Sequence, residues 1–320
     1  MSLTPSQADS SHAPPKRVSA GVHTVVPTTF SADGAVDLDS LTRVLEMVAV
    51  DGVDGVLILG VMGEAPRLLP TERQAIIART MDTVGDRLDV TVGATHPGSD
   101  GTRALARAAQ DAGATAVLIS PPKLERANPD AIVSYFQHAG DGLDLEIMLQ
   151  DHPGSTGVFI SVDLIARLAS EVDQIRSIKM EDPPTPLKVT EIRERAPKDL
   201  RIFGGLGGVF MYDELLRGAD GTMTGFAFPA VLVEVQRRYS SGDADGARSV
   251  FEKYLPLIRY EFQPAVGLSV RKYAYKLRGA VECEFVRQPA LQLDEITRAE
   301  VTDMIERLGL LEATPVGATR

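Results

Sequence analysis

The fold is decided by the stretch from Thr115 to Lys179, which contains three short apolar runs: TAVLI at 115–119, LEIML at 145–149 and IRSIK at 175–179. Helix-forming sequence separates them. Asn128 followed by Pro129 is typical of a helix start, and Ser161 similarly opens the segment Val162–Glu171. Strand and helix therefore alternate, as in parallel sheets whose strands are buried on both faces.

The same alternation extends in both directions along the chain. The other strand candidates are Gly21–Val26, Gly55–Leu59, Asp89–Gly93, Leu200–Gly204 and Gly221–Gly225. Eight such units predict an α/β fold, a closed (β/α)8 TIM barrel. An open doubly wound sheet remains compatible with the pattern, although no Gly-x-Gly-x-x-Gly follows the first strand, as a dinucleotide-binding sheet would require.

The domain organisation follows from where the strand signals stop. Beyond Arg248 the chain contains only helix-like segments, at Ala247–Ile258, Pro264–Arg278 and Asp294–Leu308. We expect a disordered leader (1–17), the barrel (18–246), a C-terminal helical extension (247–312) and a disordered tail (313–320). The leader is rich in Ser, Pro and Ala and has no apolar core of the kind found in signal peptides.

Composition excludes several classes of protein. The 33 Lys and Arg against 44 Asp and Glu give a net charge of −11, which argues against binding to nucleic acid or to an anionic membrane. The single cysteine, Cys283, excludes an internal disulfide and a Cys-based metal cluster. No apolar run approaches the roughly 18 to 20 residues of a membrane-spanning helix. A cytoplasmic location fits these features.

Lys179 is the most informative polar residue, because it ends an apolar strand in a fold whose active sites lie where strands end. Burial penalises an ammonium group and lowers its pKa, which would yield a neutral amine able to form a Schiff base with a ketone. The alternative is an ion pair with Glu181 or Asp182 at the barrel rim.

Other strand ends offer groups that could bind substrate. The turn Gly60-Val61-Met62-Gly63-Glu64 could point backbone N–H groups at a carboxylate, or could simply be a tight turn. Further strand-end candidates for substrate binding are Thr28, Gly205, Met223 and Thr224.

The order and spacing of these motifs resemble the dihydrodipicolinate synthase / N-acetylneuraminate lyase family of class I aldolases. The matching segments are Pro27–Phe30, Gly60–Glu64, Pro153–Gly157 and Ser177–Lys179. The resemblance covers roughly Val18–Leu310.

This resemblance implies a mechanism. Lys179 would condense with pyruvate or another 2-oxo acid, and the N–H groups of Val61 and Met62 would hold the carboxylate. The iminium would then act as the electron sink for lyase chemistry. We expect no cofactor and no metal ion, and the resemblance also implies a homotetramer or a homodimer.

The chain departs from the family's pattern at its proton relay. The family's catalytic tyrosine falls on Gln150, its relay threonine on Val61, and the arginine that binds the second substrate on Ser155; its other relay tyrosine is replaced near Lys123. We therefore expect an aldolase or a dehydratase of a 2-keto-3-deoxy sugar acid rather than a dihydrodipicolinate synthase. His152 is the best substitute acid or base, unless it only hydrogen-bonds at the rim.

Two other classes of function remain open from the sequence. One is a metal-dependent barrel enzyme, in which His23, His96 and His152 would act with the carboxylates of Glu64, Glu181 and Asp182. The other is a non-catalytic barrel that keeps Lys179 but only binds a 2-oxo acid.

Overall fold

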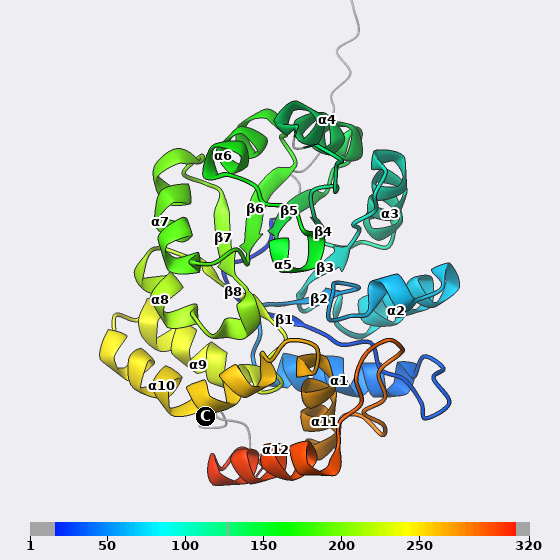
Figure 1. Ribbon diagram of the computed structural model, residues 1–320, viewed down its shortest axis with the longest axis vertical. Helices are drawn as coiled ribbons and strands as arrows, with labels where there is room; N and C mark the ends of the chain where they lie inside the picture. The colour runs from blue at the N-terminus through cyan, green and yellow to red at the C-terminus, as the bar shows by residue number, and fades with distance from the viewer. Residues whose placement is uncertain (1–16, 127, 312–320) are drawn as a thin grey trace, which may run out of the picture.

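The computed structural model describes residues 17–126 and 128–311 and confirms the predicted TIM barrel. All neighbouring strands are parallel, and β8 closes the barrel onto β1. Figure 1 shows the strands at the centre, surrounded by the helices. The strands are β1 Gly21–Val25, β2 Gly55–Ile58, β3 Asp89–Gly93, β4 Ala116–Ile119, β5 Glu146–Asp151, β6 Ile175–Met180, β7 Arg201–Gly204 and β8 Gly221–Thr224.

Helices follow the strands as the sequence predicts. Asn128 and Ser161 cap α4 and α6, since their side chains accept hydrogen bonds from the N–H groups of Ala131 and Leu164. The helices of the barrel are α1 Leu38–Val50, α2 Pro70–Val84, α3 Ser99–Asp111, α4 Pro129–Gly140, α6 Val162–Glu171, α7 Thr185–Arg195, α8 Met211–Leu216 and α9 Pro229–Ser240. Single turns lie at η1 Ala65–Arg67, α5 Pro153–Thr156 and η2 Leu206–Gly208.

Strands β5 and β6 run one or two residues further than the sequence predicts. Their register places Gln150 beside Lys179 and Asp151 beside Met180. Below this level the barrel interior is filled by buried apolar side chains, including Leu118, Met148 and Phe203. The polar side chains at the ends of β5 and β6 are therefore held on a packed base.

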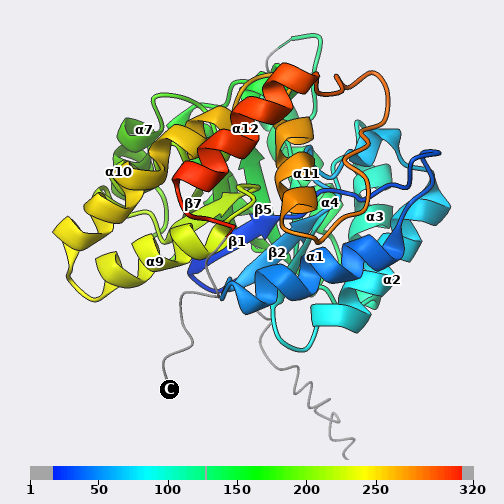
Figure 2. The ribbon, with the colours of Figure 1, turned by 90° about the horizontal axis from the view of Figure 1, so that it is seen from below.

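The C-terminal extension lies on the side of the barrel that carries α1 and α9 (Figures 1 and 2). It consists of α10 Ala244–Glu261, α11 Gly267–Leu277 and α12 Glu295–Arg307, so it begins three residues before the predicted boundary. Lys272 of α11 joins it to the turn after β2, because its Nζ lies 2.6 Å from Glu64 Oε1 in a fully buried ion pair.

The predicted leader, except Arg17, and the predicted tail lie outside the described residues. Within residues 17–126 and 128–311, none of the helices has the length and apolar character needed to cross a membrane.

Candidate active site

Lys179 points into a small cavity at the carboxyl ends of the strands. Its side chain is 7% exposed, and its Nζ lies 3.2 Å from Glu181 Oε2. The cavity has a volume of about 80 Å³, and both Lys179 and Glu181 line it. The structure thus combines the two alternatives that the sequence left open: Lys179 faces a cavity, and it forms an ion pair with Glu181.

Glu181 is the centre of the polar network around Lys179. Its carboxylate accepts hydrogen bonds from the side-chain amide of Gln150 (3.0 Å) and from the backbone N–H of Leu206 (3.4 Å). Burial opposes ionisation of this carboxyl group, but Lys179, His152 and the Gln150 hydrogen bond together hold its pKa below its usual value. Glu181 is therefore an ionised carboxylate within hydrogen-bonding distance of Lys179 Nζ.

Gln150 orients this carboxylate. Its Oε1 accepts a hydrogen bond from Ser120 at the end of β4 (2.9 Å), which fixes the amide so that its NH2 group faces Glu181. An amide does not titrate, so Gln150 positions the network and leaves proton transfer to its neighbours.

His152 lies at the edge of the same cavity. Its Nδ1 is 3.9 Å from Glu181 Oε2, beyond hydrogen-bonding distance. Burial lowers the pKa of His152, so its imidazole is neutral at neutral pH. The structure places this predicted acid or base near Glu181. Glu181, rather than His152, forms the ion pair with Lys179.

The turn after β2 contains two residues, Val61 and Met62, that line the cavity and have unpaired backbone N–H groups in the described part of the chain. Gly63 and Glu64 use their N–H groups within the turn, whereas those of Val61 and Met62 have no partner among the described residues. Val61 and Met62 both line the cavity. Thr28 does not line it; its hydroxyl donates to the Gly63 carbonyl at 2.6 Å and so holds the turn in place.

Of the remaining strand-end candidates, two line the cavity and one packs against Glu181. Met223 and Thr224 of β8 line the cavity, and the buried Thr224 hydroxyl has no hydrogen-bond partner in the described part of the chain. Gly205 supports Glu181 instead: a Cβ atom there would lie 2.2 Å from Glu181 Cγ, so only glycine allows the carboxylate its position.

The three histidines of the metal-site alternative, His23, His96 and His152, lie too far apart in the fold to bind one metal ion together. His23 lies within β1 and hydrogen-bonds the carbonyl of Ser19, and His96 is exposed in the loop after β3. Only His152 reaches the cavity. Among the residues that the structure describes, no group of three or more metal-binding side chains is arranged to hold a metal ion.

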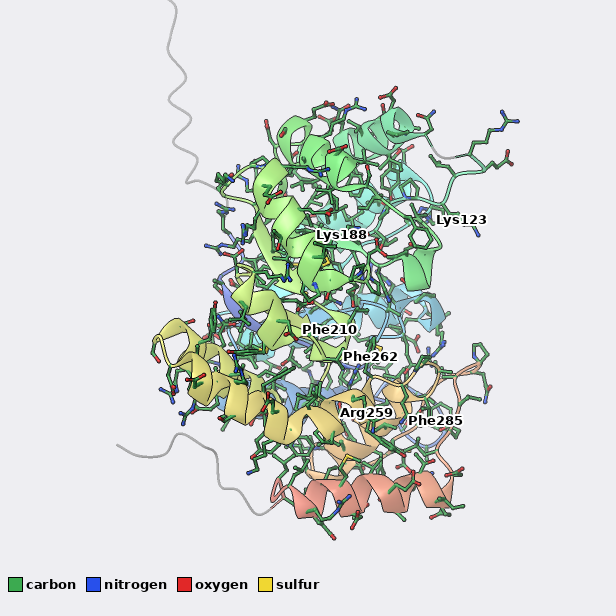
Figure 3. All side chains as sticks on the ribbon, turned by 60° about the vertical axis from the view of Figure 1, so that its left-hand side comes forward. Lys123, Lys188, Phe210, Arg259, Phe262 and Phe285 are labelled. Atoms are coloured by element: carbon green, nitrogen blue, oxygen red, sulfur yellow. The ribbon has the colours of Figure 1, made fainter. Side chains whose placement is uncertain are left out.

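Two lysines near the barrel mouth have other roles. Lys123 is exposed and points away from the barrel (Figure 3). Lys188 of α7 forms ion pairs with Asp151 (2.6 Å) and Asp182 (2.7 Å), which are therefore occupied. Neither aspartate is a free base for Lys179.

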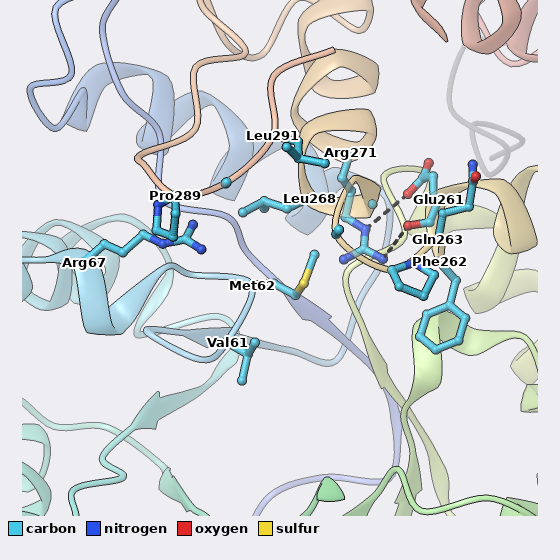
Figure 4. A pocket seen from close by; sticks show the side chains of 14 residues that line it. Val61, Met62, Arg67, Glu261, Phe262, Gln263, Leu268, Arg271, Pro289 and Leu291 are labelled. Atoms are coloured by element: carbon cyan, nitrogen blue, oxygen red, sulfur yellow. Dashed lines mark hydrogen bonds and ion pairs between the residues drawn. The ribbon is translucent and has the colours of Figure 1, made fainter. Parts of the chain in front are cut away.

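Two cavity residues come from the C-terminal extension and are not indicated by the sequence pattern: Phe262 and Arg271. Both also line an adjoining pocket of about 420 Å³ between the turn after β2 and the extension (Figure 4). A third hollow, of about 730 Å³, shares Val61 and Gln150 with the site, and Ser120 and Thr156 are among the residues that line it. The Lys179 cavity thus continues into larger spaces on two sides.

Glu214 of α8 provides a test of the buried carboxyl groups beneath the site. It is 1% exposed, and burial raises its pKa from 4.5 to about 7; the nearby negative charges of Asp213 and Glu181 act in the same direction. The folded state therefore binds this proton more tightly than the unfolded state, so its contribution to stability falls as the pH rises from about 4.5 through 7.

We expect Glu214→Gln to stabilise the protein by up to about 3 kcal/mol at pH 8, because it removes the cost of the buried charge, and to change little at pH 5. Urea denaturation of both proteins at the two pH values measures this. An equal difference at pH 5 and pH 8 would show that Glu214 does not titrate in this way.

Comparisons with known proteins agree with this geometry. Residues 18–308 match the dihydrodipicolinate synthetase family. The chain is 28% identical over 295 residues to a 4-hydroxy-tetrahydrodipicolinate synthase of Thermotoga petrophila, covering 91% of this chain and 99% of the relative. It is 29% identical over 292 residues to an L-2-keto-3-deoxyarabonate dehydratase of Azospirillum brasilense, covering 90% and 94%.

Solved structures show the same likeness. A crystal structure described as dihydrodipicolinate synthase of Rhodopseudomonas palustris is 37% identical, with a TM-score of 0.86 over 90% of this chain and 97% of that one. A prophage protein of E. coli K12, solved in complex with pyruvate, is 26% identical, with a TM-score of 0.85 over 91% and 99%. With its barrel, its buried lysine at the end of β6 and a match that spans nearly the whole described chain, this protein belongs to the dihydrodipicolinate synthetase family, whose members are class I aldolases and related lyases.

Proposed function

We propose that this protein is a Schiff-base lyase in which Lys179 condenses with a 2-oxo acid, and that its substrate is a 2-keto-3-deoxy sugar acid. The observation that carries the proposal is the position of Lys179: a buried amine in a cavity, 3.2 Å from a carboxylate. The prophage protein solved with pyruvate and the deoxyarabonate dehydratase, both relatives, support the class of substrate.

The first steps follow from the neighbours of Lys179. Glu181 accepts a proton from the ammonium, and the free amine attacks the C2 carbonyl to give a carbinolamine. Glu181 then returns the proton to the departing hydroxyl group, so that water leaves and an iminium forms. The N–H groups of Val61 and Met62, which have no partner within residues 17–126 and 128–311, would bind the C1 carboxylate.

The iminium withdraws electrons from C3. In a dehydratase, a base takes a proton from C3 and gives a proton to the C4 hydroxyl, which leaves as water. In an aldolase, a base takes the proton of the C4 hydroxyl, the electrons of the C3–C4 bond pass to the iminium to give an enamine, and the aldehyde leaves. The 730 Å³ hollow beside the cavity has room for the hydroxylated remainder of a sugar acid, and polar residues such as Ser120 and Thr156 line it. Either reaction fits the family's chemistry.

Two features favour this substrate over the one used for dihydrodipicolinate synthesis. Ser155 supplies no cation for a second carboxylated substrate, and its hydroxyl donates to the carbonyl of His152. Gln150 of β5 lies beside Lys179, where an ionisable side chain would serve a proton relay. We also expect the chain to assemble as a homotetramer or a homodimer.

The test is reduction with borohydride in the presence of pyruvate, followed by intact-mass measurement. We expect one covalent adduct per chain. Turnover is then measured on a panel of five- and six-carbon 2-keto-3-deoxy acids, by release of pyruvate or by formation of the dehydrated oxo acid.

Three outcomes are informative. An adduct with turnover of a panel member supports the proposal. An adduct without turnover of any substrate supports the alternative of a non-catalytic 2-oxo-acid-binding barrel. The absence of an adduct with pyruvate and with every other 2-oxo acid tested would overturn Schiff-base chemistry.

A further inference from the structure

Arg271 of α11 brings a buried positive charge from the C-terminal extension to the site of Lys179. Its side chain is 4% exposed, yet it lines both the Lys179 cavity and the adjoining 420 Å³ pocket. Figure 4 shows its guanidinium group near Met62. A buried arginine needs anionic or carbonyl partners for its five N–H donors.

Only part of the guanidinium group is occupied. Nε donates to Glu261 Oε2 (3.3 Å) and Nη2 to the Glu261 backbone carbonyl (3.4 Å). Both contacts are long, and no hydrogen bond within the described ranges involves Nη1. Glu261 also accepts a hydrogen bond from the N–H of Ala227 (3.0 Å), so its carboxylate is shared between two donors.

Nη1 lies against the carboxyl end of β8, where the chain leaves room for it. A Cβ atom on Gly225 would lie 2.7 Å from Nη1 and 3.1 Å from Cδ and Cζ. Gly225 directly follows Met223 and Thr224 and lines the Lys179 cavity with them. Because Gly225 has no side chain, the guanidinium group of Arg271 can lie at the wall of the Lys179 cavity.

The turn after β2 and Arg271 line the same two hollows. Val61 and Met62, whose N–H groups have no partner in the described part of the chain, line both hollows that Arg271 lines. The smaller of these two hollows, the Lys179 cavity, is only about 80 Å³, so a small anionic group inside it would lie close to both the turn and Arg271. Two backbone N–H groups and one guanidinium N–H are donors well suited to a carboxylate.

We propose that Nη1 of Arg271 binds the C1 carboxylate of the 2-oxo acid, together with the N–H groups of Val61 and Met62, and so makes the site selective for oxo acids over neutral ketones. This inference rests on the Schiff-base function proposed above. The competing explanation is that Arg271 only neutralises Glu261 and holds α10 to α11.

The experiment compares pyruvate with pyruvamide, in which a neutral amide replaces the carboxylate. Half-saturation for borohydride trapping is measured with each ketone for the wild-type protein, Arg271→Gln and the double variant Glu261→Gln/Arg271→Gln. Arg278→Gln is the matched control, because Arg278 at the end of the same helix binds Asp51 (2.9 Å) and does not line the cavity.

We expect Arg271→Gln to raise half-saturation for pyruvate about tenfold to hundredfold and to leave that for pyruvamide within about threefold, since only pyruvate loses a charge-assisted hydrogen bond. The double variant leaves no buried unpaired charge, so it decides the question if the single variant does not fold. The double variant should bind pyruvate as weakly as Arg271→Gln. Arg278→Gln should keep the wild-type preference for pyruvate over pyruvamide.

An equal loss for both ketones, or recovery of wild-type pyruvate binding in the double variant, would show that Arg271 only neutralises Glu261 and would overturn the assignment. These results leave the Schiff base intact. If the wild-type protein is trapped by neither ketone, the proposed function fails, and this inference fails with it.

Discussion

Lys179→Arg is expected to abolish the covalent adduct with pyruvate and to lower kcat by at least about 10³-fold. Arginine keeps the positive charge next to Glu181, but its guanidinium group is always protonated and cannot act as a nucleophile. The substitution therefore separates the chemical role of Lys179 from its role as an ion-pair partner. Intact-mass measurement after borohydride reduction and steady-state kinetics give the two readouts.

Lys188→Arg is the matched control for this prediction. Lys188 is also buried and paired with carboxylates, those of Asp151 and Asp182, but it does not line the Lys179 cavity. The control should keep the adduct and most of the activity. Persistence of a full adduct in Lys179→Arg would show that the nucleophile is elsewhere.

Glu181→Gln is expected to lower kcat by about 10²- to 10⁴-fold while leaving adduct formation possible over long incubation. The amide keeps the size of the side chain but cannot accept the proton of Lys179 or return it to the departing hydroxyl group. In the wild-type protein, kcat should fall as the pH drops through the pKa of Glu181, which is held below its usual value; this acid limb should be missing in the variant.

Asp182→Asn controls for the loss of a carboxylate at the end of β6. Asp182 lies one residue from Glu181 but pairs with Lys188, so its removal should change kcat by only a few fold. If Glu181→Gln keeps kcat within about threefold of the wild-type value, proton transfer must be assigned to another group, and His152 would be the next to test.

Strand positions were the most predictable part of the fold. Buried parallel strands are short runs of Val, Ile and Leu between turn residues, and all eight runs found in the sequence are strands of the barrel. Lys179 was predictable for the same reason, because a lysine at the end of such a run interrupts an otherwise apolar pattern.

The arrangement of polar groups around Lys179 was less predictable, because it depends on register and on distant segments. Only the pairing of β5 with β6 shows that Gln150 lies beside Lys179, and only packing shows that Lys188 occupies Asp151. Gly205 was expected to face the substrate, whereas it makes room for Glu181. No strand pattern could indicate Arg271, which reaches the site from a helix outside the barrel.

Lys272 is the chemical competitor that a strict test of Lys179 must exclude. It is almost completely buried, and burial lowers its pKa to about 8 despite its ion pair with Glu64, so it could supply a neutral amine. It lines none of the three hollows around the site, whereas Lys179 lines the central cavity.

The most direct test of the central claim is to locate the reduced pyruvate adduct by proteolytic digestion and tandem mass spectrometry of the wild-type protein. We predict a single modified residue, Lys179. Modification at Lys272, at Lys188 or at several exposed lysines, with Lys179 unmodified, would contradict the account of this site as one built around the amine at the end of β6.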